Sequence, residues 1–374
     1  MEGKRRYMMR ALDLAAEARG RTSPNPMVGA VVVGEEGVVG EGCHLRVGED
    51  HAEVRALAAA GKRARGADLY VNLEPCSHHG RTPPCTEAIK DAGVHRVFAA
   101  IKDPNPLVAG KGAEDLRRAG ISVRFGLAAS EARRLNEAFL KYIRTGMPFV
   151  FLKTAVSLDG KTATRKGDSR WISNVQARAR VHELRDGADA IMVGIGTVLA
   201  DDPRLTARLP EGAGRSPHRI VIDPLLRTPP GARVLTAEAG SRTILVAAGR
   251  ASAEKADRLE SRGAEVMIME GEGRTIDMGR LMRRLGKMGM TSVMVEGGSE
   301  VAASLLSAGV VDKVVYFIAP KIIGGREAPG AVGGEGAGLM KEALELKDLR
   351  ATVLGDNIMV EGYLRQQGEW CSPD

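Results

Sequence analysis

Residues 51–85 read HAEVRALAAAGKRARGADLYVNLEPCSHHGRTPPC, and this stretch determines the expected fold and chemistry of the first half. It contains one imidazole, His51, and two thiols, Cys76 and Cys85. These three ligands suit zinc and leave its fourth tetrahedral position to a water, whose pKa the metal lowers toward neutrality. Glu53 can take a proton from that water and pass it to a leaving amine. The pattern predicts a catalytic zinc site.

The spacing of these residues also predicts the local structure. Residues 54–60 are rich in Ala, Leu and Arg and precede a Gly, so we expect a helix with His51 and Glu53 in its first turn. A strand is expected over 69–73 and a second helix over 86–92. Both thiols then lie near a helix N-terminus, where the helix dipole favours the thiolate.

Zinc-dependent base deaminases use this ligand set, with a Glu two residues after the His as general acid/base. The alternative is a structural zinc knuckle that takes His78 or His79 as fourth ligand, but a knuckle gives no reason for Glu53 or for the distant His51. The nucleic-acid deaminases have two residues between their Cys ligands, whereas here residues 77–84 intervene. That insertion holds two His and Arg81, which could line a pocket for an anionic small molecule.

Length and composition restrict the class of protein. A chain of 374 residues suggests two domains, and its hydrophobic content of 44% is sufficient for two cores. The net charge is +7, but the basic residues are scattered among acids, which indicates solvated helix faces rather than a nucleic-acid footprint. Four Cys make no disulfide framework, and no apolar run reaches the length of a membrane span. We expect a cytoplasmic protein in a reducing compartment that binds neither membrane nor nucleic acid.

The rest of the first half alternates between helical and strand patterns. Helices are expected over 7–19, 112–118 and 130–143, and strands over 28–33, 38–39, 94–101 and 121–125. This alternation predicts a layered α/β domain with the metal at helix N-termini on one sheet edge.

Polar residues follow several of these elements. Asn25 lies between two prolines, where its amide could read the edge of a heterocycle or cap its own turn. His44 ends a strand, and a lone His there is often a surface or core residue. Asp103 and Asn105 follow the strand over 94–101, and open α/β sheets bind ligands at the carboxyl ends of their strands.

The second half begins near residues 144–148, which break a helix. A helix capped from Ser173 is expected to run to Asp186, and another over 301–308. The expected strands form a mostly parallel sheet with a late antiparallel ending, over 149–153, 190–193, 219–222, 243–247, 265–268, 292–295, 313–318 and 358–364. Residues 209–216 and 224–241 are rich in Pro, Gly and Arg, and we interpret them as surface loops.

Two glycine turns in this half lie between a strand and a helix. Gly194 and Gly196 resemble a dinucleotide fingerprint, but its third Gly is replaced by Leu199. Gly297 and Gly298 lead into a helix, which suits either an anion site or a tight turn without a ligand.

The motifs of the first half together resemble the bifunctional deaminase–reductase family of riboflavin biosynthesis. They are NPMVG at 25–29, GCH at 42–44, HAE at 51–53, the run at 75–85 and DPNP at 103–106. The resemblance implies a cytidine-deaminase-like three-layer α/β/α fold. It also implies zinc-hydroxide deamination at C2 of 2,5-diamino-6-(5-phosphoribosylamino)pyrimidin-4-one, with release of ammonia. His51, Cys76 and Cys85 would bind zinc, and Glu53 would transfer protons. The substrate would contact Asn25, His44, His78, Arg81, Asp103 and Asn105.

The second half resembles the reductase of the same family, which has a dihydrofolate-reductase-like α/β fold and uses NADPH. The motifs are LKTAVSLDG at 152–160, SRWIS at 169–173, GTVLADDPRLT at 196–206, EGG at 296–298 and APK at 319–321. The resemblance implies substrate contacts at Ser169, Arg185, Leu205, Arg208 and Glu296. It implies NADPH contacts at Ala155, Trp171, Thr197, Asp201, Gly298, Ser299, Glu300, Val301, Ala302, Ala303 and Ser304.

The implied second reaction is consistent with these side chains. A ribosylamine opens to an imine, and hydride at C1′ gives 5-amino-6-(5-phosphoribitylamino)uracil. Arg185 and Arg208 would hold the phosphate, while the cofactor supplies the hydride. Lys153 and Asp201 are candidates for proton transfer, although either could belong to a structural ion pair.

The expected organisation is a deaminase domain over 1–146, a reductase domain over 147–366 and a disordered tail over 367–374. The family resemblance implies self-association through the second domain. Two other classes remain open. A tRNA-type base deaminase would need stacking aromatics, which make up only 3% of this chain. A binding module with structural zinc would not need Glu53.

Overall fold

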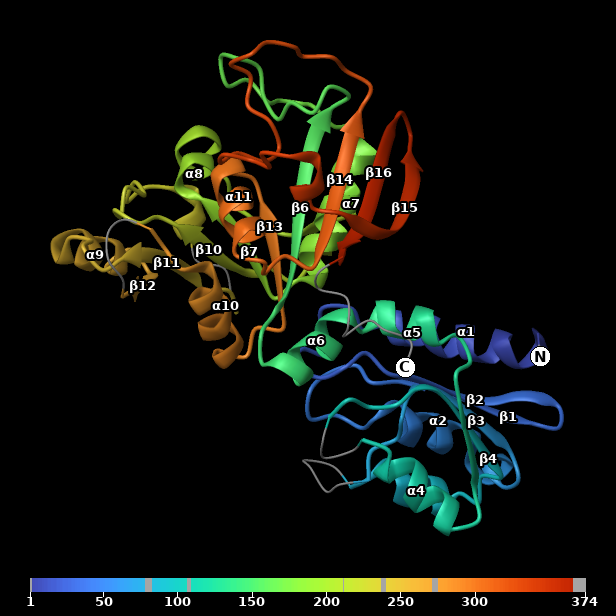
Figure 1. Cartoon of the computed structure of the whole chain (residues 1–374). Helices are drawn as coiled ribbons and strands as arrows, with labels where there is room; N and C mark the ends of the chain where they lie inside the picture. The colour runs from blue at the N-terminus through green and yellow to red at the C-terminus, as the bar shows by residue number, and fades with distance from the viewer. Residues whose placement is uncertain are drawn as a thin grey trace. The chain divides into compact units, whose positions relative to one another are not determined.

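The computed structural model describes residues 2–77, 83–105, 109–210, 212–236, 240–270 and 275–365. The chain forms two compact units, of which the first ends at Gly146 and the second begins at Met147 (Figure 1). Among the described residues, no helix combines the length and the apolar character that crossing a membrane requires.

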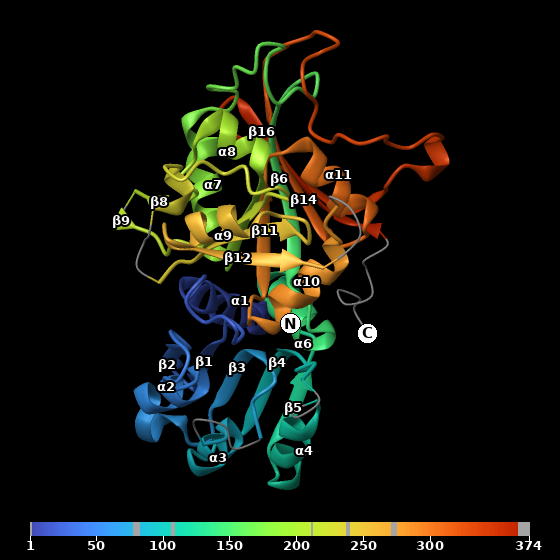
Figure 2. The same ribbon diagram turned by 90° about the vertical axis from the view of Figure 1, so that its left-hand side faces the viewer.

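The described part of the first unit contains one five-stranded sheet in the order β2-β1-β3-β4-β5 (Figure 2). Its strands are β1 Gly29–Gly34, β2 Gly37–Cys43, β3 Asp68–Leu73, β4 Arg96–Ile101 and β5 Ser122–Phe125. The β1 strand pairs antiparallel with β2 and β3, whereas β3, β4 and β5 are parallel. The carboxyl ends of β3 and β4 therefore lie together, which brings the residues that follow them to one edge of the sheet.

Helices cover both faces of this sheet, because successive strand residues point to opposite sides. Val31, Tyr70 and Phe98 pack on one face, against α1 Glu2–Glu17, α5 Ala129–Leu135 and α6 Glu137–Thr145. Val32, Val71 and Ala99 pack on the other, against α2 Ala52–Ala60, α3 Cys85–Asp91 and α4 Lys111–Arg118, and the 3₁₀ turn Gly61–Ala64 follows α2. The predicted three-layer α/β/α architecture is confirmed.

The second unit is built on a sheet in which nine described strands follow the order β12-β11-β10-β7-β13-β6-β14-β16-β15. The strands are β6 Phe149–Ser157, β7 Ala190–Gly194, β10 His218–Ile222, β11 Thr243–Ala248, β12 Ala264–Met269, β13 Ser292–Glu296, β14 Lys313–Ala319, β15 Leu346–Leu354 and β16 Asn357–Leu364. Strand β16 runs antiparallel to both of its neighbours, β14 and β15, whereas the other pairs of neighbouring strands in this sheet are parallel (Figure 1). The predicted parallel sheet with an antiparallel ending is confirmed, although β15 was not predicted.

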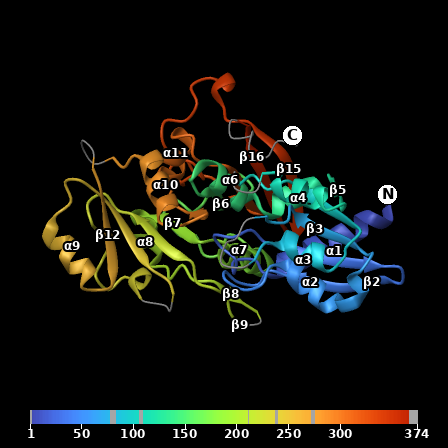
Figure 3. The same cartoon turned by 90° about the horizontal axis from the view of Figure 1, so that it is seen from below.

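Two hydrophobic layers enclose this sheet. One layer holds α10 Met278–Lys287 and α11 Ser299–Ser307, which lie on the same side of the sheet (Figure 3). The other holds α7 Val175–Gly187, α8 Ile195–Asp201 and α9 Ala253–Glu260. Short elements complete the unit, namely β8 Arg208–Leu209, β9 Gly212–Ala213, η2 Arg233–Leu235 and η3 Met340–Glu342.

Three local predictions were wrong. The helix expected over 130–143 is two helices that meet at Asn136, whose buried amide accepts from Met27 N at 2.8 Å and donates to Met27 O at 2.9 Å. The cap of α7 is Asn174, which accepts from Ala177 N at 2.8 Å, rather than Ser173. The loop over 224–241 is not purely a surface feature, because Val234 is fully buried in the core.

Candidate functional site

The three predicted metal ligands converge on one point in the first unit. His51 Nδ1 lies 3.2 Å from Cys85 Sγ and 3.5 Å from Cys76 Sγ, and the three ligand atoms all lie within 4.8 Å of one another. Tetrahedral zinc, with about 2.1 Å to nitrogen and about 2.3 Å to sulfur, separates its ligand atoms by roughly 3.5–3.8 Å. The donor set and its spacing therefore fit zinc.

Helix ends hold these ligands in place. His51 is the N-cap of α2, and its carbonyl accepts the first helical hydrogen bond, from Arg55 N. Cys85 begins α3, and its backbone N donates to Cys76 Sγ at 3.3 Å. Hydrogen bonds from the Cys85 thiol and from His51 lower the pKa of the Cys76 thiol. The Cys85 backbone amide at the start of α3 adds to this effect, so the helix N-terminus also favours the thiolate that zinc requires.

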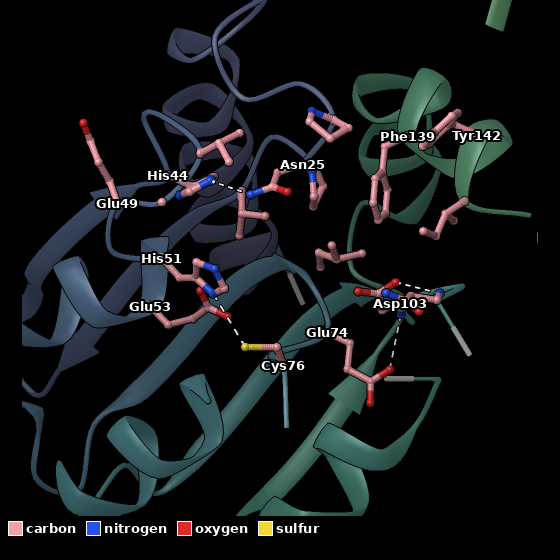
Figure 4. A pocket seen from close by; sticks show the side chains of 18 residues that line it. Asn25, His44, Glu49, His51, Glu53, Glu74, Cys76, Asp103, Phe139 and Tyr142 are labelled. Carbon is pink, nitrogen blue, oxygen red and sulfur yellow. Dashed lines mark hydrogen bonds between the residues drawn. The ribbon is translucent and has the colours of Figure 1, made fainter. Parts of the chain in front are cut away.

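Glu53 lies in the first turn of α2, beside the metal ligands (Figure 4). Its side chain is buried, and burial together with the negative charge of Cys76 raises the pKa of its carboxyl group to about 7. A general acid/base works best with a pKa near the operating pH. The approach of α2 depends on Gly42 in β2, since a Cβ there would lie 2.6 Å from Ala52 O.

A pocket of about 490 Å³ opens over these residues, and four predicted substrate contacts line it. His44 Nδ1 donates to Asp50 O at 3.3 Å, so its Nε2 can accept from Asn25 Nδ2 at 3.2 Å. Burial lowers the pKa of His44, which favours the neutral ring. Burial raises the pKa of Asp103 to about 6, and Asp103 Oδ1 accepts from Asn105 N at 2.8 Å. His78 and Arg81 lie outside the described residues.

Sequence reasoning missed several pocket residues. Glu49 and Glu74 line it, as do Phe139, Tyr142 and Ile143 of α6 (Figure 4). The helical spacing of Phe139 and Tyr142 was the available signal, but it does not distinguish a pocket wall from a core face.

In the second unit, Glu296 lies between two cations. It pairs with Lys153 in the register of β13 and β6, and Lys153 Nζ lies 3.5 Å from Glu296 Oε2. The Arg185 guanidinium donates to both Glu296 oxygens, at 2.5 and 2.8 Å, and to Thr206 O at 3.1 Å. Against the effect of burial, Arg185 and Lys153 lower the pKa of Glu296 to about 2, while burial lowers the pKa of Lys153.

A second basic group lies beside this ion cluster. Arg208 Nη1 is 3.5 Å from Thr206 Oγ1, and Arg208 Nη2 is 3.2 Å from His182 Nε2. Burial and the charges of Arg185 and Arg208 lower the pKa of His182 to about 4. Leu205, the residue before Thr206, is buried and has a positive φ of 55°. Arg185 and Arg208 therefore both contact Thr206. Arg185 binds its carbonyl oxygen, and Arg208 lies near its hydroxyl group.

The predicted cofactor contacts fall into two groups. Thr197 of α8 lies beside the turn that leads into α11, because a Cβ on Gly297 would be 3.2 Å from Thr197 Oγ1. That turn continues through Gly298 into α11, which holds Ser299, Glu300, Val301, Ala302, Ala303 and Ser304. Ala155 lies on β6 next to Phe317 of β14.

The remaining predicted residues lie on loops or at helix ends. Trp171 is 64% exposed, its ring lies 4.6 Å from the Arg178 guanidinium, and its carbonyl accepts from Lys321 Nζ. Ser169 O accepts from Ile172 N in the same loop. Asp201 ends α8, and its carbonyl accepts from Arg170 Nη2 at 3.1 Å.

Both units match known families. Residues 1–101 match the cytidine and deoxycytidylate deaminase zinc-binding region, and residues 148–360 match the RibD C-terminal domain. The chain is 47% identical over 352 residues to the riboflavin biosynthesis protein RibD of Bacillus amyloliquefaciens, which covers 94% of each chain. It is 46% identical over 329 residues to RibD of Escherichia coli, which covers 85% of this chain and 88% of the relative.

Solved structures agree with these matches. Acinetobacter baumannii RibD superposes with a TM-score of 0.84 at 36% identity, over 96% of this chain and 98% of the other. The diaminohydroxyphosphoribosylaminopyrimidine deaminase/5-amino-6-(5-phosphoribosylamino)uracil reductase of Thermotoga maritima superposes with a TM-score of 0.82 at 36% identity, over 96% and 98%.

Proposed function

The chain belongs to the RibD family of riboflavin biosynthesis proteins, and we propose how its residues divide the two reactions of that family. It is a bifunctional enzyme with a zinc-dependent deaminase unit and an NADPH-dependent reductase unit. Deamination at C2 of 2,5-diamino-6-(5-phosphoribosylamino)pyrimidin-4-one comes first. Reduction of the ribosyl group then gives 5-amino-6-(5-phosphoribitylamino)uracil.

In the first reaction the C2 amine is replaced by oxygen from water, and ammonia leaves. Zinc, held by His51, Cys76 and Cys85, supplies the activation of the water when it is bound. Glu53 takes a proton from the water and delivers it to the leaving amine, since its carboxyl group is buried beside the ligands and its pKa is near neutrality. Glu53 is thus the proposed catalytic base and acid.

The pocket walls orient the pyrimidine. We assign Asn25, His44, Asp103 and Asn105 to its polar edge, because all four line the same pocket as Glu53. Neutral His44 accepts from the Asn25 amide and so sets the direction in which that amide presents its oxygen. His78 and Arg81 remain proposed substrate contacts, and the guanidinium of Arg81 suits the phosphate.

The single observation that carries the deaminase assignment is the convergence of one imidazole, two sulfurs and a buried carboxylate at one pocket. The test is Glu53→Ala in the zinc-loaded full chain. Ammonia release should fall by about three orders of magnitude, while zinc content and reductase activity stay unchanged. Retained deamination would contradict the mechanism.

In the second reaction NADPH supplies a hydride to C1′ of the opened ribosyl group. Arg208 and Arg185 are assigned to the substrate phosphate, with Ser169, Leu205 and Glu296 around the ribose. Lys153 is the proposed proton donor, because burial lowers the pKa of its ammonium group and favours release of its proton. Asp201 is the second candidate.

We assign the cofactor to the cleft beside Thr197 and the turn that leads into α11. Closely approaching glycines and helix amides suit the phosphates of NADPH. Ala155, Trp171, Asp201 and residues 298–304 are the proposed contacts. Equilibrium titration of NADPH should therefore lose affinity in Thr197→Val while deamination is retained.

The most informative experiment supplies the diaminopyrimidine with and without NADPH and identifies the products by mass. Without NADPH, the aminouracil should accumulate with its ribosyl group intact. With NADPH, the product should gain two hydrogens. A protein that deaminated an RNA oligonucleotide and ignored the pyrimidine would instead be a nucleic-acid deaminase.

We propose that the two units are independent domains, over 1–146 and 147–366. The compact division at Gly146 and Met147 supports this boundary. Chains expressed separately over 1–146 and 147–374 should each fold and keep one activity. If either piece failed to fold, the proposal of two independent domains with this boundary would be wrong.

We further propose that the chain is a cytoplasmic homo-oligomer. Strand β15 is an edge strand, and its Leu349 and Val353 side chains are 60% and 73% exposed. These two apolar side chains lie on the same face of the strand, and contact with a second copy would remove them from water. Sedimentation velocity should give an oligomer in the native chain and a smaller species in Leu349→Lys/Val353→Lys. Cell fractionation tests the compartment.

A further inference from the structure

Glu74 is a buried carboxylate that none of the assigned steps uses. It follows the last residue of β3, is 3% exposed and lines the deaminase pocket. Its backbone N donates to Ile101 O at 3.0 Å and so continues the pairing of β3 with β4. Two residues later the chain reaches the metal ligand Cys76.

The Glu74 side chain accepts hydrogen bonds from three backbone amides of one distant segment. Oε2 accepts from Asp103 N at 3.3 Å and from Gly110 N at 3.0 Å. Oε1 accepts from Ala113 N at 3.0 Å. A carboxylate is suited to this role because it has two oxygens and accepts only.

Two of these amides belong to the start of α4. Gly110 is its N-cap, and Ala113 lies in its first turn, where N–H groups have no partner within the helix. Glu74 therefore caps α4 from a remote part of the chain, and its negative charge complements the helix dipole.

The same segment is packed tightly against Glu74 and Pro75. A Cβ on Gly112 would lie 2.0 Å from Pro75 O, so the first turn of α4 approaches this backbone as closely as a glycine allows. Asp103 is also joined to Asn105 through the bond from Asn105 N to Asp103 Oδ1. Figure 4 shows the Glu74 carboxylate close to Asp103 and on the same side of the pocket as Cys76.

We infer that Glu74 is a positioning residue for deamination, which holds Asp103 at a set position relative to Cys76. The inference rests on the proposed function of Asp103 as a substrate contact. Glu74 binds the Asp103 backbone and lies two residues before the metal ligand Cys76. It therefore fixes the distance between a pyrimidine bound to Asp103 and the metal. Small errors in such placement are costly, because the reacting atoms must lie in contact and in line.

The test is Glu74→Gln in the zinc-loaded full chain. Glutamine keeps one acceptor oxygen but turns an amide NH₂ toward backbone N–H donors, so at least one of the three bonds is lost. The kcat/KM for deamination should fall at least tenfold, mainly through KM, with unchanged zinc stoichiometry and unchanged reductase kinetics. The matched control is Glu114→Gln, an exposed position on α4 whose deamination should stay at the native value.

A double-mutant cycle with Asp103→Ala separates positioning from general stabilisation. If Glu74 acts through Asp103, Glu74→Gln should change KM less than threefold once Asp103 is Ala. Additive losses in the cycle, or loss of zinc from Glu74→Gln, would overturn the inference. If Asp103→Ala alone leaves kcat/KM unchanged, the proposed role of Asp103 fails instead.

Glu74→Asp keeps the measurement possible should the Gln variant not fold. It retains the charge but withdraws the oxygens by one methylene, so they cannot reach Asp103 N and Ala113 N together. The same rise in KM is expected, and native kinetics in this variant would also refute the inference.

Discussion

Replacing Arg185 by Ala should lower the stability of the second unit and slow the reduction of the substrate. The guanidinium donates to both oxygens of Glu296, at 2.5 and 2.8 Å, and the Glu296 side chain is 9% exposed. Lys153, at 3.5 Å, would be its remaining cation. Breaking a buried ion pair from one side costs about 3–5 kcal/mol, because the remaining charge stays desolvated. With Lys153 still present, we expect the free energy of unfolding of the second unit to fall by about 3 kcal/mol.

A second variant separates the structural role of Arg185 from substrate binding. In Arg185→Ala/Glu296→Gln the Glu296 carboxylate is removed together with Arg185, but the buried Lys153 then loses its counter-ion, so only part of the lost stability should return. Reduction should not return, because the substrate phosphate still lacks one of its two proposed cations. Relative to Glu296→Gln alone, kcat/KM for the phosphorylated substrate should remain about a hundredfold lower, which corresponds to about 2.7 kcal/mol.

Hydrogen exchange of peptides from β6 and β13 during denaturant unfolding would report the second unit separately from the first. Oxidation of NADPH measures reduction, and ammonia release serves as the internal control. If the double variant reduces the substrate as fast as Glu296→Gln, Arg185 only neutralises Glu296 and the phosphate assignment is refuted. An unchanged free energy of unfolding in Arg185→Ala would refute the expected loss of about 3 kcal/mol.

Three further predictions concern pH, metal and a helix junction. The Glu296 pKa is lowered from 4.5 to about 2. Its contribution to stability is therefore complete above about pH 4.5 and is lost as the pH falls toward 2. In Glu296→Gln, acid unfolding should lack the loss of stability between these two pH values. Removal of zinc with a chelator should lower the melting temperature of the first unit and abolish deamination, while NADPH oxidation continues. Asn136→Ala removes both hydrogen bonds to Met27 and should destabilise the first unit by about 2–3 kcal/mol, measured by thermal unfolding of residues 1–146.

The metal ligands were predictable because zinc chemistry restricts both residue type and local spacing. His51 and Glu53 lie in one helical turn, and Cys85 begins a helix that its own flanking residues predict. Such features depend on neighbours in the sequence, so periodicity and capping residues suffice to infer them. Most strands were predictable for the same reason, since each is marked by its own apolar run.

The break between α5 and α6, which was not predicted, depended on a distant partner. Asn136 interrupts a helical pattern because Met27, 109 residues earlier, offers its backbone groups to the Asn136 amide. The burial of Val234 in a loop rich in Pro and Gly likewise follows from packing against the sheet. Composition reports neither contact, because both are made by residues far apart in the chain.

By itself, the sequence determined the two α/β units, the zinc-binding residues and the proposal of a carboxylate beside them, since each follows from residue type and local periodicity. Only the tertiary structure decided that Lys153 and Arg185 both meet Glu296, and that Glu74 joins the metal loop to Asp103. Those contacts depend on strand register and on the approach of separate segments, which are set by the packing of the whole domain rather than by any local pattern.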